Sequence, residues 1–157
     1  MNPFALGLIT AAAVAMATGP PSTPEPPSGQ WPVTPASVLR GFEPYEWYGP
    51  GHRGVDLVAA PGQPVHSALP GVVTVAGWVA GRPLVAVRHR DGLRTTYLPV
   101  LPTVRVGDRV AAGEPVGRLR TGRHCTQTSC LHWGARRGDD YLDPLTLVAP
   151  QVVLLPP

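Results

Sequence analysis

Three polar residues of this chain have the types and the spacing of a metal site. His52 and Asp56 lie four residues apart within residues 51–57, and His132 lies within residues 130–134. Two imidazoles and a carboxylate give zinc three ligands and leave its fourth position open, which is typical of catalytic zinc sites. Each piece also has an ordinary interpretation: a surface hydrogen bond for the His-x-x-x-Asp pair, and a packed side chain for a histidine beside a tryptophan.

The absence of lysine excludes several other chemistries. All 13 basic residues are arginine. A phosphate-binding P-loop, a pyridoxal enzyme, and a lipoyl or biotinyl carrier each need a lysine. The net charge of +3 and isoelectric point of about 9.3 suit an anionic surface weakly. Because the arginines form no long run, we expect no nucleic-acid partner.

The N-terminal part of the chain has the composition of an export leader and a spacer. Residues 1–17 are apolar and alanine-rich and end in small residues, which predicts a signal peptide or an apolar leader. The run is too short to span a bilayer comfortably, so we expect no stable transmembrane span once the leader is cleaved. Residues 18–35 are rich in Pro, Ser and Gly, which predicts an extended linker. Residues 36–157 are expected to hold the folded domain.

Short apolar runs between glycine turns predict an all-β domain of antiparallel strands with little helix. The expected strands are residues 72–76, 84–89, 93–97, 109–111, 115–119 and 131–135. A single helical turn is expected to start at Asp143, and residues 136–140 are expected to form a charged, solvated hairpin turn. The tight turns of residues 104–117 resemble those of barrel-sandwich hybrid folds.

A series of segments occurs in an order that resembles one family. The series comprises residues 51–57, 60–65, 71–73, 77–78, 93–97, 106–110, 116–117, 131–132 and 143–145. Over about residues 50–147 the chain resembles the lysostaphin-type (LytM-like) zinc metalloendopeptidases of bacterial cell walls. The resemblance implies a sheet with a groove, one Zn2+ ion, and peptidoglycan peptides as substrate. It places the zinc ligands at His52, Asp56 and His132.

Two catalytic histidines of that family are replaced here, by Pro99 and Cys130. Because strand side chains alternate, Cys130 is expected to share a face with His132 and Pro99 with Tyr97, so that both replacements face the groove. Acid–base catalysis is worth ~10²–10⁴-fold and oxyanion stabilisation ~10²–10³-fold, and proline supplies neither. Tyr97, as an oxyanion donor, and His124, in the loop before Cys130, are the candidate catalytic replacements.

The two cysteines, Cys125 and Cys130, have two interpretations. In an exported protein an even pair usually forms a disulfide, which here would fix the loop that leads to His132. Alternatively, the Cys130 thiolate fills the fourth zinc position and makes the site structural. We expect the disulfide, because thiols exported to an oxidising space rarely stay free.

The remaining histidines and aromatic residues have less specific interpretations. His66 and His89 are predicted to be solvated histidines at strand edges. Tyr45, Trp47 and Tyr48 precede the metal motif, and they either line a peptide groove or pack under the sheet.

These observations predict an exported zinc domain, extracellular or associated with the cell wall, of the peptidoglycan endopeptidase type. Its hydrolysis is expected to be weak or lost, so that it acts on or binds peptidoglycan peptides or activates a partner cell-wall hydrolase. The alternative is an active peptidase with a rearranged catalytic set. A purely structural domain is disfavoured by the intact ligand set.

Overall fold

The computed structural model describes residues 29–43, 49–121, 125 and 128–148. The predicted leader, His124 and the aromatic residues at 45, 47 and 48 lie outside these ranges. No helix in the described ranges is both long and apolar enough to cross a membrane. The strands are β1 (Val38–Arg40), β2 (Val55–Val58), β3 (Pro64–His66), β4 (Gly71–Val79), β5 (Arg82–Arg88), β6 (Leu93–Leu98), β7 (Val100–Pro102), β8 (Arg109–Val110), β9 (Pro115–Leu119), β10 (Cys130–Arg137) and β11 (Asp140–Leu142). Two short 3-10 helices are η1 (Arg90–Gly92) and η2 (Pro144–Val148).

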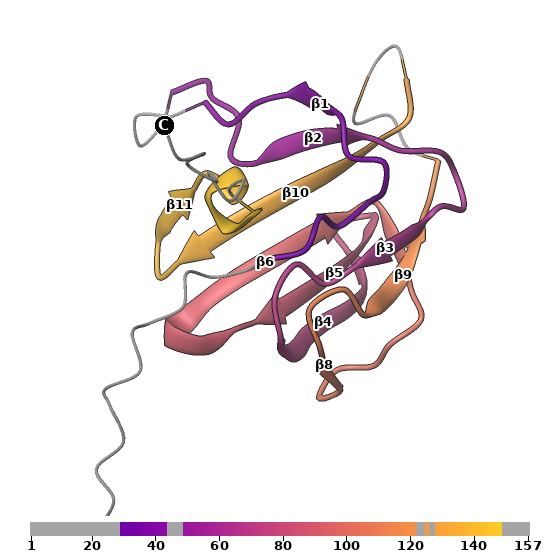
Figure 1. Cartoon of the computed structure of the whole chain (residues 1–157), viewed down its shortest axis with the longest axis vertical. Coiled ribbons are helices and arrows are strands. Elements are labelled where there is room, and N and C mark those ends of the chain that lie inside the picture. Colours follow the sequence, from indigo (N-terminus) through magenta and orange to yellow (C-terminus); the bar gives the residue numbers. More distant parts are fainter. Residues whose placement is uncertain (1–28, 44–48, 122–124, 126–127, 149–157) are drawn as a thin grey trace, which may run out of the picture.

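The strands form two antiparallel sheets, so the predicted all-β class is confirmed. The larger sheet has the order β1-β2-β10-β6-β5-β4-β8, with β11 paired to β10, and the smaller has the order β3-β9-β7 (Figure 1). The six predicted strands correspond to β4, β5, β6, β8, β9 and β10. The sequence pattern missed β1, β2, β3, β7 and β11 because three or four residues are too few to show alternation.

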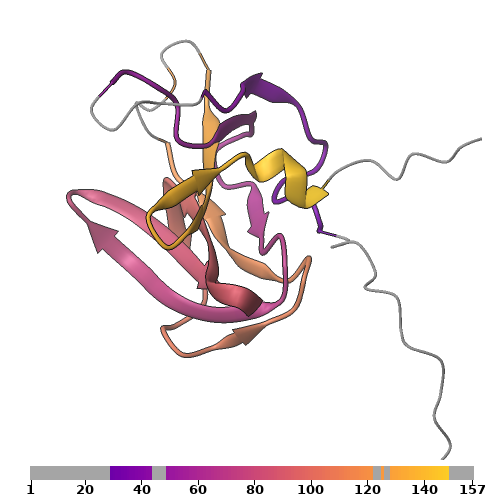
Figure 2. The same ribbon diagram turned by 90° about the vertical axis from the view of Figure 1, so that its left-hand side faces the viewer.

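Alternation along β6 and β10 divides the large sheet into a core face and a polar face. Tyr97 and Trp133 are opposite each other across these strands, and both side chains are fully buried. Leu98 and His132 form the next pair and are only half-buried, on the other face. The smaller sheet adds Val65, Val100, Val116 and Leu119 to the core. Figure 2 shows the β4–β5 hairpin reaching out from the body of the domain.

The domain begins before residue 36, which corrects the predicted extent of the 18–35 linker. Val33 is fully buried in the core. The Trp31 ring packs against that of Trp133, with 6.3 Å between the ring centroids. Residues 29–35 therefore belong to the folded domain. Composition misled here because prolines around a few apolar side chains do not prevent those side chains from filling a core.

The prediction of a solvated edge position is wrong for His89, which is buried. A carbonyl only accepts, so Nδ1 of His89 donates to the Pro70 oxygen at 2.9 Å, and Nε2 faces the Thr95 hydroxyl at 2.7 Å. Thr95 Oγ1 lies 2.9 Å from the Tyr97 hydroxyl, which accepts from the Ala68 N–H at 2.8 Å. Burial lowers the pKa of His89 and raises the pKa of Tyr97.

Two turn predictions near the end of the described chain are confirmed as turns, although Arg136, predicted to be solvated in the hairpin, is half-buried in β10. The helical turn η2 follows Asp143, whose carboxylate accepts the Leu145 N–H at 2.9 Å. The β10–β11 hairpin reverses at Gly138, where φ is +59°. Glycine adopts that backbone conformation without the steric cost of a side chain.

The buried His89 makes stability depend on pH. The folded-state pKa of His89 lies below its ordinary value of 6.5, so the unfolded chain binds the proton more readily. We expect the contribution of neutral His89 to the free energy of unfolding to be fully present above pH ~6.5. Below that value the free energy of unfolding should fall, by at most ~1.4 kcal/mol per pH unit.

Urea unfolding of the wild type and His89→Gln, measured between pH 7.5 and 5, checks this expectation. The glutamine amide can still donate to Pro70, but it does not titrate in this range. The variant should therefore lose less stability on acidification than the wild type. His66→Gln, at the end of β3, is the matched control, and equal pH slopes for wild type and His89→Gln would contradict the prediction.

Candidate metal centre

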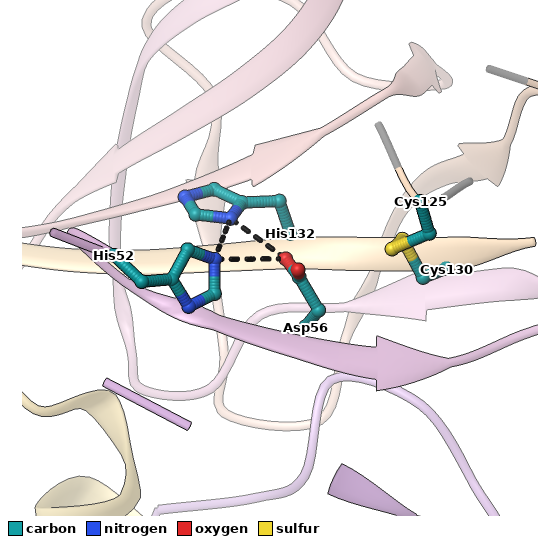
Figure 3. The surroundings of a disulfide bond; sticks show 5 residues. All are labelled: His52, Asp56, Cys125, Cys130 and His132. Carbon is teal, nitrogen blue, oxygen red and sulfur yellow. Dashed lines mark hydrogen bonds and ion pairs between the residues drawn. A yellow bond between two sulfur atoms is a disulfide. The ribbon is translucent and has the colours of Figure 1, made fainter. Parts of the chain in front are cut away.

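Pairing of β2 with β10 brings the predicted ligands together. Asp56 in β2 and His132 in β10 are direct cross-strand partners, so their side chains leave the sheet on the same face. His52 precedes β2 and is fixed by a bridge to Glu43, whose N–H donates to the His52 carbonyl at 3.0 Å. Figure 3 shows the three side chains converging on one point.

The three donor atoms form a small triangle. His52 Nε2 lies 3.2 Å from Asp56 Oδ1 and 3.1 Å from His132 Nδ1, and the third edge, from His132 Nδ1 to Asp56 Oδ1, is 2.9 Å. A tetrahedral zinc with bonds of ~2.0–2.1 Å holds its donors about 3.3 Å apart. The triangle therefore has close to the dimensions that a zinc ion requires.

Hydrogen bonding sets the tautomer of His52. Its Nδ1 donates to the Gly41 carbonyl at 2.7 Å, which leaves a lone pair on Nε2 of the neutral ring. Metal-binding histidines are commonly oriented in this way through their second nitrogen. The Nε2 lone pair then faces the Asp56 carboxylate, and two acceptors repel each other. A cation bound between them would remove this repulsion, because both atoms would coordinate it.

The environment of the triangle is closed on one side and open on the other. The side chains of His52 and Asp56 are each 6% exposed, whereas the His132 side chain is 14% exposed. A bound cation would thus be shielded by protein at its back and accessible from the side of His132. Such a site fits three protein ligands plus one exchangeable position.

Gly54, which the sequence analysis did not single out, makes room for His132. A Cβ atom at this position would lie 2.5 Å from the Trp133 carbonyl oxygen and 2.8 Å from His132 Nε2. Any side chain would therefore displace the His132 ring or the strand that carries it. The signal available in the sequence was a glycine between His52 and Asp56.

The predicted disulfide between Cys125 and Cys130 is present. Cys130 is opposite Val58, two residues from the pair of His132 and Asp56, so it shares their face of the sheet as predicted. Both sulfur atoms lie within 4.8 Å of an Asp56 carboxylate oxygen. In the disulfide neither sulfur is a thiolate, which leaves the three-residue set as the ligand set.

Tyr97, the predicted oxyanion donor, lies on the wrong face of the sheet. Its cross-strand partner is Trp133, its side chain is fully buried, and its hydroxyl is bonded to Ala68 and Thr95. The reason is the period of two: His132 is opposite Leu98, so Tyr97 points to the core. It does not reach the metal centre.

Pro99 lies beyond the regular part of β6. It is buried in a bend, and its carbonyl accepts the Arg120 N–H at 2.9 Å. Strand alternation ends at Leu98, so counting from Tyr97 does not place the proline ring on the face of His132. His124, the other catalytic candidate, lies outside the described residues.

A groove of about 280 Å³ extends from His132 along the polar face of the sheet. Its position gives the open side of the triangle a place for an extended ligand. No acidic residue is part of its lining, which consists of Arg53, Arg94, Thr96, Leu98, His132, Gly134, Ala135, Arg136 and Tyr141.

Comparison with known proteins gives the family. The profile of Peptidase family M23 matches residues 50–144, which include all three residues of the triangle. The chain belongs to peptidase family M23.

Curated relatives agree in sequence over most of the chain. A protein of Mycobacterium tuberculosis, Rv2891, is 45% identical over 135 residues, which cover 81% of this chain and 54% of that protein. The Escherichia coli lipoprotein YgeR is 29% identical over 147 residues, which cover 89% of this chain and 56% of YgeR. The chain therefore spans about half the length of these relatives.

Solved structures share the fold. The catalytic domain of the antimicrobial peptidase lysostaphin from Staphylococcus simulans superposes with a TM-score of 0.63 at 26% identity, covering 73% of this chain and 93% of that domain. A zinc-containing peptidase from Vibrio cholerae superposes with a TM-score of 0.60 at 25% identity, covering 76% of this chain and 39% of that peptidase.

Removing one corner of the triangle should abolish metal binding. We expect the purified domain to hold close to one zinc per chain and His132→Ala to lose it, because two remaining ligands bind zinc far more weakly. Metal analysis after dialysis without chelator measures this. His66→Ala, a half-buried histidine at the end of β3, should keep its zinc. A zinc-free wild type would contradict the assignment.

The state of the cysteines should change the metal spectrum. Denatured, unreduced wild type should contain no titratable thiol, and its cobalt-substituted form should lack a thiolate-to-metal charge-transfer band. Cys125→Ser frees Cys130 near Asp56, so the cobalt form of this variant should gain that band. The double variant with Cys130→Ser is the control without sulfur. A band in oxidised wild type would show that sulfur is already a ligand.

Proposed function

We propose that this chain is an exported, zinc-binding domain that acts on or binds peptidoglycan peptides, with hydrolysis that is weak or lost. The observation that carries the proposal is the triangle of His52, Asp56 and His132 with its open side toward a groove. A structural zinc would need a fourth protein ligand. In the described residues, the nearby sulfur atoms are bound to each other instead.

Zinc fits the donor set better than the other common divalent ions. Two imidazoles and one carboxylate in a compact triangle suit zinc, whereas calcium and magnesium prefer sets of oxygen ligands. When bound, zinc supplies Lewis-acid polarisation of a peptide carbonyl and lowers the pKa of water. His52 would bind through Nε2 while its Nδ1–H holds the ring against Gly41.

Weak hydrolysis is proposed from what the chain offers around this centre. Cys130 lies on the face of His132, and its sulfur is bonded to Cys125. The resemblance to lysostaphin-type enzymes leads us to expect a histidine at this position. Tyr97 is turned to the core. Among the described residues near the triangle, no free imidazole is left for acid–base catalysis, which is worth ~10²–10⁴-fold.

Membership of the family and the lining of the groove support peptide as the ligand. Lysostaphin, which shares the fold, is a peptidase by name, and an open groove beside the centre suits an extended chain. The disulfide supports export, because such bonds persist in oxidising compartments. The predicted leader, residues 1–17, would direct that export.

Activity should be recoverable by restoring the replaced histidines. The zinc-loaded wild type should hydrolyse purified cell walls slowly or not at all, followed by turbidity and by released peptides. The variant carries Cys130→His, which puts an imidazole on the face of His132, together with Pro99→His and with Cys125→Ser to avoid a stray thiol. It should gain ~10²–10⁴-fold, the usual worth of an acid–base group.

Two controls accompany this measurement. Adding His132→Ala to the triple variant should remove the regained activity, since the centre would be lost. Zinc content and an unfolding curve of each sample test whether the domain stays folded and keeps its metal site without the disulfide. A wild type that lyses walls as fast as active relatives would overturn the proposal of weak hydrolysis and favour a rearranged catalytic set.

A further inference from the structure

Three arginines form a row across the polar face of the large sheet. Arg136 in β10 is the cross-strand partner of Arg94 in β6, and Arg94 is the partner of Arg88 in β5. Cross-strand partners project on the same face. Arg136 lies four residues after His132 in β10, so by alternation this is also the face of the metal triangle.

The row is costly for an isolated domain. Like charges placed directly opposite each other in a sheet destabilise it. None of the three guanidinium groups forms an ion pair with a carboxylate of the described residues. The Nε atom of Arg94 is buried and has no acceptor there. A row of like charges without acidic partners in the described residues is better explained by an anionic ligand than by folding.

Two arginines of the row lie in the groove that has His132 in its lining. Arg94 and Arg136 line the groove together with His132 and Tyr141. The Arg136 guanidinium lies 5.9 Å from the centre of the Tyr141 ring, which supports the arginine from the side of β11. The lining holds three arginines, Arg53, Arg94 and Arg136, and no carboxylate, so the groove offers an anion hydrogen-bonding cations without repulsion.

Strand geometry gives the separation between the row and the centre. Arg136 is four residues along β10 from His132, and a strand advances ~3.3 Å per residue, which makes about 13 Å. An extended peptide with its reacting carbonyl at the centre would place a group three or four residues away beside the arginines. The flexible arginine side chains widen this reach by a residue in either direction.

We propose that Arg94 and Arg136 form a subsite for a carboxylate of the bound peptide, about 13 Å from the metal centre. The inference rests on the proposed function and adds a substrate class to it: peptides with a free carboxylate rather than neutral ones. Arginine is suited to this role, since its planar group binds a carboxylate through two parallel hydrogen bonds. Arg88, more exposed at the far end of the row, adds long-range attraction.

Binding of synthetic peptides to the full zinc-loaded chain tests the subsite. The probes are one extended peptide in three forms: with an acidic side chain and a C-terminal carboxylate, with the side chain amidated, and with the C-terminus amidated. Titration calorimetry gives Kd for each form. The expected result is ~10–100-fold weaker binding when the carboxylate that reaches the row is amidated, the usual worth of a charge-assisted hydrogen bond. Comparing the two amidated forms identifies which carboxylate it is.

Substitutions then assign the effect to the row. Arg94→Gln with Arg136→Gln should weaken binding of the free-carboxylate peptide by the same ~10–100-fold and leave the amidated peptide unaffected. Arg109→Gln in β8, at the opposite edge of the sheet, is the matched control and should bind like wild type. Because the substitutions relieve like-charge contacts, the double variant should unfold at the same urea concentration as wild type or a higher one.

The outcomes separate the subsite from the proposed function. Equal Kd values for free and amidated peptides, or for wild type and the double variant, would overturn the subsite. If the same samples hold zinc and sediment with purified cell walls, the proposed function stands without the subsite. A wild type that binds no peptide would overturn the subsite. A wild type that holds no zinc, or that neither binds nor cuts cell walls, would count separately against the proposed function.

Discussion

The pairing of β2 with β10 is the constraint on which the rest of this structure depends. It sets Asp56 opposite His132, although 76 residues separate them in sequence. A slip of one residue would turn one of the two side chains to the core face. Gly54 belongs to the same constraint, because only a residue without a side chain lets the chain pass the His132 ring on its way into β2.

The same alternation that assembles the centre also fixes what surrounds it. On the core face, Trp133 and Tyr97 anchor the hydrophobic interior, and the Tyr97 hydroxyl joins a buried chain of hydrogen bonds that ends at His89. On the polar face, the same two strands present His132, Arg94 and Arg136. Groups that differ by one position in sequence thus have unrelated surroundings, one in the core and the other on the polar face.

The triangle is held by fixed covalent and hydrogen-bonded contacts, whereas the groove beside it is lined by positive charge. The disulfide bonds the two sulfur atoms to each other close to Asp56, so that neither is a free thiolate. The hydrogen bond to Gly41 orients His52 before any ion arrives. Further along β10, the arginines have no carboxylate partner among the described residues. The sheet tolerates this because its hydrophobic packing is on the opposite face.

The sequence by itself determined the all-β class, the longer strands and the cysteine pair, and it singled out the three residues that meet in the triangle, because these depend on local alternation, turn residues and side-chain chemistry. Only the tertiary structure decided the roles of Tyr97, His89 and residues 29–35, because burial depends on which strand lies opposite. The sequence does not reveal the row of arginines either. Arg88, Arg94 and Arg136 are far apart along the chain, and only strand register places them side by side. Register is set by long-range pairing, which no short window of sequence contains.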